Sequence, residues 1–335
     1  MITRIALLCT LIFAAAHSAP AQDIDTKGQD FNTKVFDPNQ MSTFSIIARD
    51  PATGEMGAAF QSKAFAGGNR IFDARGGFAV IAHQAVSDPI YGVLGFELLQ
   101  AGMTPQDALD LMVRGDNGGL RRQVAILDFQ GRSAAWSGPN CDDWKGHHCA
   151  ANYCAQGNTL TGPEVLDAMV RTFESSKAPL AERMLAALDA AQAAGGDVRG
   201  VQSAALVIVK PLAGAAGFSD RSIDIRVDDS KQPLTELRRL LNMARSGEII
   251  AEVGAKLRDG DLNGALQRAI AARDRSPEND NAWIALATVY VKVNRKEDAL
   301  AALKRAGELN PANNRQMPLN PTFAPLYRTT PQTGR

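Results

Sequence analysis

Residues 42–63 read STFSIIARDPATGEMGAAFQSK, and they hold two runs of strand-forming residues on either side of a turn at Pro51–Gly54. Thr43 and Ser45 have the same parity in the first run, so a strand places both hydroxyls on one face of its sheet. A small nucleophile at the mouth of an antiparallel sheet is one way to build a hydrolase. The stretch therefore predicts a hairpin that carries candidate chemistry.

The chain after this hairpin alternates between strand-like and helix-like segments. Residues 77–86 and 121–138 have strand character, whereas residues 91–113 indicate two helices that break at Gly102–Pro105. Two further helices, over 162–176 and 179–196, precede two further strands within 203–229. Because the strands come in hairpins rather than between helices, we expect an α+β domain of antiparallel sheets covered by helices, spanning residues 42–230.

Length and composition limit the classes of protein that need to be considered. The 335 residues predict two folded units. The composition is that of an ordinary globular protein, 45% hydrophobic and 21% charged, and the formal net charge is zero. This balance gives no electrostatic footprint for a polyanion, so no nucleic-acid partner is expected.

The N-terminus has the pattern of a secretory signal. Arg4 precedes an apolar run over residues 5–16, and Ala19 and Ala21 fit a cleavage site of small residues. A run of about 12 apolar residues is shorter than the ~20 that span a bilayer, and no later segment is apolar enough to do so. We predict a signal over residues 1–21, a flexible leader over 22–41, and an exported protein, periplasmic or secreted, without a membrane span.

Export permits disulfides, and three cysteines remain after the predicted cleavage. Cys141, Cys149 and Cys154 lie close together with two histidines between them. One local disulfide with one free thiol is one interpretation, and a metal site is another. The spacing is not one of the common zinc patterns, so no metal and no cofactor are predicted.

The last third of the chain has helical character throughout and contains a repeat. Ala265-Leu266 and Ala299-Leu300 are 34 residues apart, as are Pro277 and Pro311. That period is typical of tetratricopeptide repeats, which present grooves to partner proteins or pack against neighbouring elements. We expect a small all-helical region over residues 234–311, for protein binding or self-association, and a disordered tail over 312–335.

Five motifs of the main domain, in order, resemble a known family. They are TFSIIARDPATGEMG, SK-AFAGG, HQAVSDPIYG, QGNTLTGPEV and GGDVRGVQSAAL. Together they resemble domain of unknown function 1028, a family placed in the N-terminal-nucleophile (Ntn) hydrolase superfamily. The resemblance implies a four-layer αββα sandwich and leaves the substrate open.

The resemblance also implies a nucleophile. Ntn hydrolases use an N-terminal Thr, Ser or Cys side chain, with its own α-amine, of pKa about 8, as the base. Thr43 corresponds to that residue, yet it follows Ser42 and the leader, so its amine is free only after a second cleavage. Ser45 with His83 as base is an alternative, and a structural or ligand-binding role for both hydroxyls is a third. Lys63 is either a group that lowers the nucleophile's pKa or binds a carboxylate, or a solvated surface lysine, and His83 is alternatively a buried, hydrogen-bonded histidine.

Other polar residues near predicted strand ends are candidates for substrate binding: Gln84, Asp88, Gln156, Asn158 and Asp197. Arg199 is expected either to complete the site or to pair with Asp197. The sequence therefore leads to two alternative functions. The chain is either an exported amide hydrolase acting on a small-molecule or peptide-like substrate, or a non-catalytic protein that binds a ligand or partner and uses its helical region for interaction.

Overall fold

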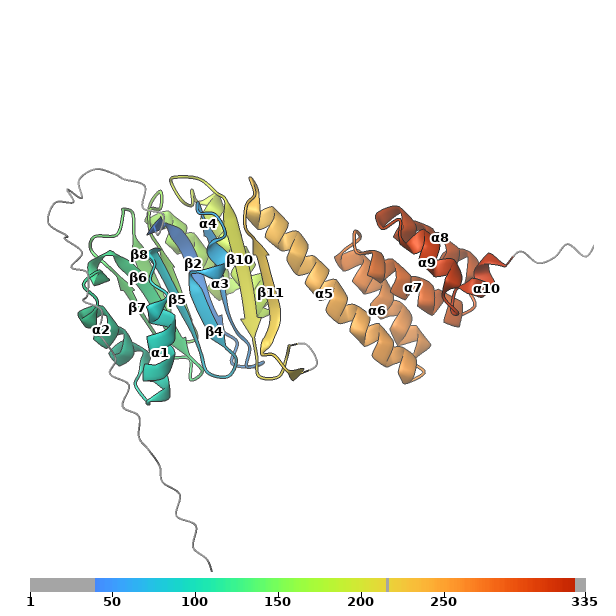
Figure 1. The fold of residues 1–335 in the computed structure, drawn as a ribbon, viewed down its shortest axis with the longest axis horizontal. Helices are drawn as coiled ribbons and strands as arrows, with labels where there is room; N and C mark the ends of the chain where they lie inside the picture. The colour runs from blue at the N-terminus through green and yellow to red at the C-terminus, as the bar shows by residue number, and fades with distance from the viewer. Residues whose placement is uncertain (1–39, 215–216, 329–335) are drawn as a thin grey trace, which may run out of the picture. The chain divides into compact units, whose positions relative to one another are not determined.

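The computed structural model describes residues 40–214 and 217–328 (Figure 1). The predicted signal and residues 22–39 of the predicted leader lie outside the described residues. The last two leader residues do not follow the prediction of a flexible segment, because Gln40–Met41 form a short strand, β1, whose backbone pairs with β5. Two residues are too few to give an alternating pattern that a sequence reader would recognise.

The predicted hairpin is confirmed. Strands β2 (Thr43–Arg49) and β3 (Met56–Ser62) pair antiparallel, with Thr43 opposite Ser62. The turn between them forms because the Asp50 carboxylate accepts from the amide of Ala52, and Gly54 takes a positive φ of 74°. Glycine adopts that conformation without steric cost, which is why the chain can reverse there.

Two antiparallel sheets are present in the described part of the chain, and we call them sheet A and sheet B. Sheet A has the order β1-β5-β6-β7, with β4 also beside β5, and sheet B has the order β11-β10-β3-β2-β9-β8. The strands of sheet A besides β1 are β4 (Phe72–Arg75), β5 (Ala79–Val86), β6 (Arg122–Asp128) and β7 (Ser133–Ser137). Those of sheet B besides β2 and β3 are β8 (Gly146–Ala150), β9 (Tyr153–Gly157), β10 (Ser203–Val209) and β11 (Arg221–Val227).

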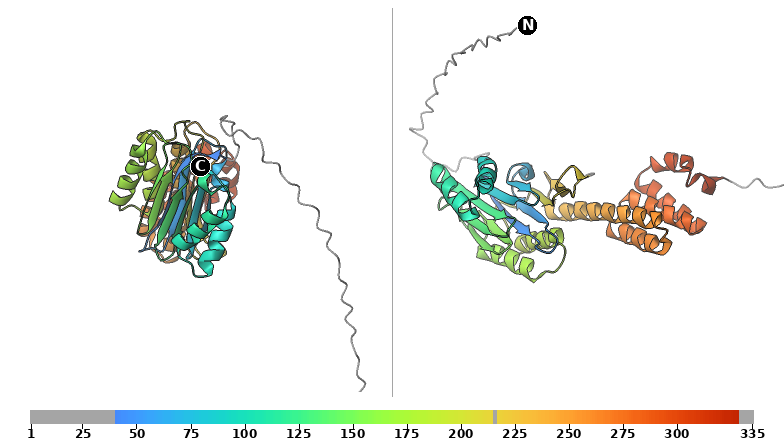
Figure 2. Two further views of the ribbon diagram at one scale, coloured as in Figure 1. Left: turned by 90° about the vertical axis from the view of Figure 1, so that its left-hand side faces the viewer. Right: turned by 90° about the horizontal axis from the view of Figure 1, so that it is seen from below.

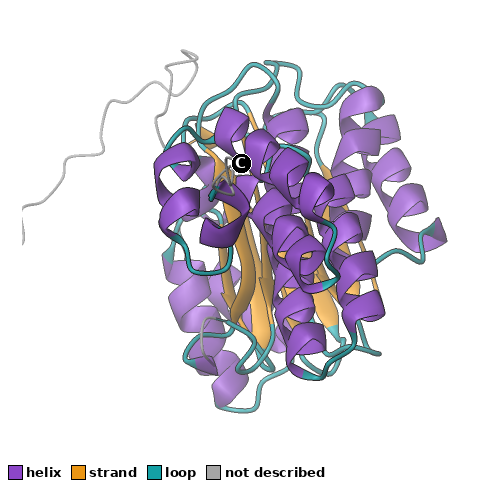
Figure 3. Cartoon of the chain, turned by 90° about the vertical axis from the view of Figure 1, so that its right-hand side faces the viewer, coloured by secondary structure: helices purple, strands orange, loops and turns teal. Residues whose placement is uncertain are grey.

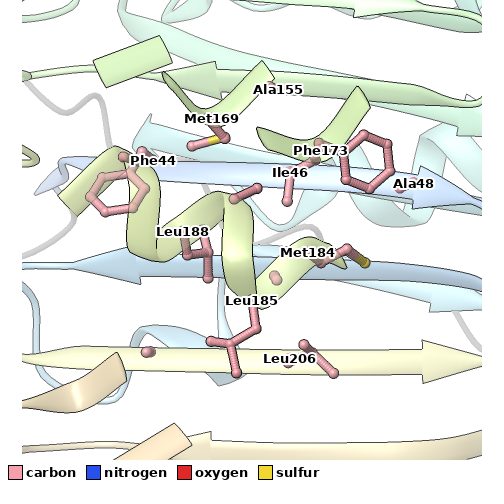
Figure 4. Packing of buried hydrophobic residues seen from close by; sticks show 14 of the residues in the cluster. Phe44, Ile46, Ala48, Ala155, Met169, Phe173, Met184, Leu185, Leu188 and Leu206 are labelled. Carbon is pink, nitrogen blue, oxygen red and sulfur yellow. The ribbon is translucent and has the colours of Figure 1, made fainter. Parts of the chain in front are cut away.

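Helices cover the outer face of sheet B. Phe44, Ile46 and Ala48 of β2 alternate with the hydroxyl-bearing residues and pack against α3 (Pro163–Ser175) and α4 (Leu180–Ala193). Figure 4 shows these side chains meeting residues of the two helices, among them Met169 and Leu185. Burial of this apolar face fixes the register of β2, since a slip by one residue would turn Phe44 and Ile46 toward sheet A and the hydroxyls toward α3 and α4.

Sheet A is covered in the same way by α1 (Ile90–Gln100) and α2 (Pro105–Gly115). The left view of Figure 2 shows helices on both sides of the strands. The predicted start of α2 is confirmed, because the Thr104 side chain accepts from the amide of Asp107 and Pro105 takes the first helical position. The α+β class is thus confirmed, with a domain of antiparallel sheets.

The space between the two sheets has two unlike ends. One end is apolar, and its buried residues include Ile47 and Met56 of sheet B together with Val80 and Leu127 of sheet A. The other end, beyond Ser45, is lined by hydroxyl and amide side chains. An interior that changes from apolar to polar along its length needs every buried polar group to find a partner, and this end is where the candidate site lies.

The described residues after β11 form helices and loops, and they contain no strand (Figure 3). The main helices are α5 (Pro233–Arg258), α6 (Leu262–Arg275), α7 (Asp280–Lys292) and α8 (Lys296–Leu309). Short helices α9 (Asn313–Gln316), η4 (Met317–Leu319) and α10 (Ala324–Tyr327) follow. The expected disorder over residues 312–335 is therefore wrong for residues 312–328: Met317 and Phe323 are buried among residues of α7 and α8. None of the described helices is long and apolar enough to cross a membrane.

The cysteine segment forms a strand that its composition did not predict. Strand β8 pairs with β9, and Cys149 lies opposite Cys154 with a disulfide between them. Cys141 is a free, buried thiol, and burial raises its pKa to about 11. One local disulfide and one free thiol is the first of the two interpretations of this segment, and it is confirmed.

Candidate functional site

The polar end of the space between the sheets gathers residues from five strand ends and the loop after β9. Alternation along each strand directs them inward, on the same face as Ile47 or Leu127 farther along. They are Thr43 and Ser45 of β2, Ser62 of β3, Gln84 of β5, Gln123 of β6, Gln156 of β9, and Asn158 in the following loop. Each is buried, with at most 2% of its surface exposed.

Gln123 fixes the orientation of the whole amide network. Its Nε2 donates to the carbonyl oxygens of Gly146, at 3.1 Å, and Gly157, at 2.8 Å. Carbonyl oxygens only accept, so the nitrogen of the Gln123 amide must face them and its Oε1 must accept. That oxygen receives Gln84 Nε2 at 2.7 Å and Asn158 Nδ2 at 2.9 Å.

The direction of these hydrogen bonds determines the state of Ser45. Gln84 uses its nitrogen toward Gln123 and toward the Thr43 carbonyl oxygen, so its Oε1 accepts, and Ser45 Oγ donates to it at 2.7 Å. A hydroxyl has one proton, so Ser45 can only accept from Gln156 Nε2, which lies 3.4 Å away. Gln156 Oε1 has no hydrogen-bond partner among the described residues. Ser45 therefore positions its neighbours, and its proton is already committed.

Thr43 has a different arrangement, because its hydroxyl lies next to the peptide bond that precedes it. Thr43 Oγ1 donates to Ser62 Oγ at 3.0 Å, and Ser62 Oγ donates to the carbonyl oxygen of Ser42 at 2.6 Å. Ser42, Thr43 and Ser62 are all fully buried. The two hydroxyls form a proton path from the candidate nucleophile to the carbonyl of the Ser42–Thr43 bond.

Arg199 approaches the same carbonyl from another segment. Its Nη2 donates to the Ser42 oxygen at 2.8 Å, and Asp197 holds the guanidinium through Nε, at 3.0 Å, and Nη2, at 2.7 Å. The Asp197 side chain is fully buried. A two-point pair of this kind fixes the plane of the guanidinium as well as its charge. Arg199 thus places a positive charge where negative charge would develop if that carbonyl were attacked.

Ser42 also contacts Thr159, the residue after Asn158. Thr159 Oγ1 donates to Ser42 Oγ at 2.7 Å. Thr159 has a φ of 57°, a left-handed conformation that is strained for a β-branched residue. Strain of this kind persists where the surroundings demand a particular side-chain position, and here it brings the Thr159 hydroxyl to Ser42.

Three of the predicted residues lie away from this site. His83 alternates with Gln84 on β5, so it faces the helices of sheet A, where its ring nitrogens contact Ser87 Oγ at 2.9 Å and Asp73 Oδ2 at 3.2 Å. It is not the partner of Ser45. Lys63 has an exposed side chain, and only its backbone amide contacts the site, through Asp197 at 3.4 Å.

Asp88 belongs to an ion-pair cluster near the start of α1. Arg122 donates to Asp88, at 3.1 Å, and to Asp116, at 2.8 Å, and Tyr91 donates its hydroxyl to Asp116. Burial alone would raise the pKa of Asp116, but the hydrogen bonds from Arg122, the Gly118 amide and Tyr91 outweigh it and lower that pKa from 3.8. Burial and the nearby Asp116 carboxylate raise the pKa of Tyr91. The cluster anchors a loop and does not touch Thr43.

The structure also adds residues that sequence reasoning missed: Ser62, Gln123 and Thr159. Ser62 follows from register, since a seven-residue pairing over the predicted turn places it opposite Thr43. Gln123 is the single amide side chain of an otherwise largely apolar strand, and only the alternation of β6 indicates that it faces the other sheet. Within the described residues, no group of three His, Cys, Asp or Glu side chains is placed to hold a metal ion. The site's donors are hydroxyls, amides and one guanidinium, groups that can stabilise charge in acyl transfer.

Comparisons with known proteins agree with the predicted resemblances. The model of a family of unknown function, DUF1028, matches residues 43–237, and a tetratricopeptide-repeat model matches residues 256–317. Protein SPO2555 from Silicibacter pomeroyi, whose crystal structure is described as DUF1028, is 31% identical, with a TM-score of 0.56. That match covers 61% of this chain and 89% of the other. No curated protein matches the chain. The repeat segment is consistent with protein interaction.

Proposed function

The chain belongs to DUF1028, a family of unknown function, and from its own geometry we propose that it is an amide-bond hydrolase with Thr43 as nucleophile. In this proposal the two sheets and their helices form an αββα sandwich of the Ntn type. The leader is removed by cleavage between Ser42 and Thr43. The observation that supports the proposal most is the contact of Thr43, Ser62 and Arg199 with that one peptide bond.

The cleavage balances as an acyl shift followed by hydrolysis. Thr43 Oγ1 attacks the carbonyl carbon of Ser42, its proton passes to Ser62, and the proton of Ser62 passes to the carbonyl oxygen. That proton then moves from the oxygen to the nitrogen of Thr43 as the carbon–nitrogen bond breaks and the carbonyl re-forms, and an ester joins Ser42 to Thr43 Oγ1. Water hydrolyses the ester, which leaves a carboxylate on Ser42 and a free amine and hydroxyl on Thr43. Arg199 stabilises the negative charge that develops on the oxygen before the proton of Ser62 arrives.

The same groups then serve a substrate amide. The free α-amine of Thr43, with a pKa of about 8, accepts the hydroxyl proton during attack. Gln84 and Asn158 hold the Thr43 carbonyl, through a side-chain nitrogen at 2.9 Å and a backbone amide at 3.0 Å, and so keep the nucleophile in place. Departure of residues up to Ser42 opens the closed site to substrate. Ser45, Gln123 and Gln156 act as positioning residues.

The mature N-terminus tests this proposal. The full-length chain is produced with its signal, and the exported protein is analysed by intact mass and terminal sequencing. The expected N-terminus is Thr43, and Thr43→Ala should retain the leader whereas Thr43→Ser should still lose it. Thr53→Ala, in the exposed turn of the same hairpin, is the matched control and should be processed normally. A protein that hydrolyses amides with its N-terminus at Gln22 would refute the mechanism. Export itself is part of the proposal, on the pattern of residues 1–21.

A further inference from the structure

The residue that precedes the nucleophile occupies a closely fitted position. Ser42 is fully buried, its carbonyl oxygen accepts from Arg199 and Ser62, and its hydroxyl accepts from Thr159 at 2.7 Å. Upstream of it, the backbone of β1 pairs antiparallel with β5, with Met41 opposite Ala85 and Gln40 opposite Val86. The chain before Thr43 is thus bound like an extended peptide that ends in serine.

The proposed chemistry relates the position of Ser42 to the position of a substrate. Cleavage of the leader and turnover of a substrate pass through the same linkage, an ester between an acyl carbon and Thr43 Oγ1. In the first case the acyl group is the peptide that ends at Ser42. The groups that hold Ser42 therefore surround the acyl part of any ester formed at Thr43, whatever amide supplied it.

We propose that the enzyme's substrates are peptide-like amides whose acyl part ends in a seryl residue, and that Thr159 determines this preference. The inference rests on the proposed function and names the substrate class of that site. The substrate's extended backbone takes the place of β1 beside Ala85 and Val86, as peptides do when they add to an open strand edge. Its carbonyl oxygen accepts from Arg199 and Ser62, and its hydroxyl accepts from Thr159.

The conformation of Thr159 supports a selective role for its hydroxyl. A β-branched residue at a φ of 57° is held at a cost in stability. Glycine would take the same backbone conformation freely and would lack the hydroxyl. We therefore expect Thr159→Gly to raise the stability of the processed chain and to lower its selectivity, a combination that a purely structural threonine would not give.

The test uses the full-length, exported and processed chain with fluorogenic amides of 7-amino-4-methylcoumarin. The acyl parts are acetyl-Gln-Met-Ser, acetyl-Gln-Met-Ala, acetyl-Gln-Met-Leu and the shorter acetyl-Ser. One neutral hydrogen bond to the transition state corresponds to a preference of roughly 3- to 10-fold in kcat/KM, which is the expected ratio of the seryl to the alanyl compound. The leucyl compound should be poorer than both, because Ser42 is fully enclosed. Acetyl-Ser should fall below the longer seryl compound by about 10-fold.

Two variants separate the role of the hydroxyl from that of shape. Thr159→Val keeps the branched side chain and should bring the seryl-to-alanyl ratio close to one. Thr53→Val makes the same change in the exposed hairpin turn and should leave that ratio at its original value. A ratio near one in the unmodified enzyme, or a ratio that Thr159→Val does not change, overturns the inference.

Failure of this inference can be told apart from failure of the proposed function. A processed chain that starts at Thr43 and hydrolyses other acyl amides, without preference for serine, refutes the substrate assignment alone. A chain that retains Ser42 as an internal residue refutes both. A processed chain that hydrolyses none of the four compounds is tested by adding acetyl-Gln-Met-Ser, the expected product, and following thermal unfolding. Stabilisation by that peptide and not by acetyl-Gln-Met-Leu supports the acyl site, and equal responses overturn it.

Discussion

Replacement of Gln123 by methionine should destabilise the sheet domain far more than its single amide would indicate. Methionine has similar length and fits a buried position, so the change removes hydrogen bonds rather than volume. It leaves the Gly146 and Gly157 carbonyls without the Gln123 donor, and Gln84 and Asn158 without its acceptor.

The magnitude follows from which partners have a substitute. Gln84 Nε2 still donates to the Thr43 carbonyl, whereas Asn158 Nδ2 loses Gln123 Oε1 as its acceptor. A buried polar group left without a partner costs about 1–3 kcal/mol. If Asn158 Nδ2 and one of the two glycine carbonyl oxygens lose their partner at about 1.5 kcal/mol each, the free energy of unfolding should fall by about 3 kcal/mol.

Fluorescence can report on the sheet domain alone. Trp136 and Trp144 lie in that domain, and Trp283 lies in the helical region, so a Trp283→Phe background removes the signal from the repeats. Urea unfolding of Gln123→Met is then compared with Gln106→Met, an exposed glutamine of α2 whose amide contacts Asp110. Gln106→Met should change the unfolding free energy by less than about 0.5 kcal/mol. A loss below about 1 kcal/mol for Gln123→Met would refute the claim that this residue organises the network.

Three further changes test other parts of the molecule. Gly92→Ala would place a Cβ in collision with Asp73 Oδ2, so it should displace the Asp73 carboxylate from His83 and lower the melting temperature. Gly247→Ala in α5 is the control: its Cβ would meet open space, so it should raise the free energy of unfolding by about 0.5–1 kcal/mol. Because the pKa of Asp116 is lowered, its ion pair stabilises the fold above about pH 4, and this contribution is lost as the pH falls further. Asp116→Asn should therefore be less stable at pH 7, and its unfolding free energy should fall less steeply between neutral and acid pH. An equally steep fall in both proteins would contradict this. Reduction of the Cys149–Cys154 disulfide, which closes a short loop, should cost roughly 2 kcal/mol, and native Cys141 should resist alkylation at pH 8 until the chain unfolds, as mass spectrometry of trapped thiols would show.

Strand alternation predicted most of the sheet domain and the inward direction of Thr43 and Ser45. The same alternation on β5 places His83 and Gln84 on opposite faces of sheet A, which shows why only Gln84 reaches Ser45. What alternation cannot supply is contact between distant segments. Arg199 meets the Ser42 carbonyl from 157 residues away, and such a contact depends on how the two sheets and the loop after α4 come together.

Local patterns also failed where a segment is short or strained. Strand β1 has two residues, so it carries no period, and its partner is distant in sequence. Thr159 takes a left-handed conformation that propensity assigns to glycine or asparagine, so nothing in QGNT marks it as a site residue. Strained backbone of this kind persists only where the surrounding structure overrides local preference, which is why rules of local preference fail at Thr159.

The position of Ser42 leads to a last prediction, because its departure removes an acceptor from three donors, of which Arg199 keeps Asp197 and Thr159 keeps Asn158 Oδ1 at 3.3 Å. Arg199, Ser62 and Thr159 all donate to Ser42, and the loss of residues up to Ser42 also removes the pairing of β1 with β5. Processed protein should therefore melt at a lower temperature than the Thr43→Ala precursor, even though that substitution itself removes a buried hydroxyl. Added acetyl-Gln-Met-Ser should restore part of the difference in proportion to the logarithm of its concentration, as ligands that bind only the folded state do. Differential scanning calorimetry of the two forms measures this directly. A processed chain at least as stable as the precursor would mean that Ser42 is not the group that these donors are arranged to bind.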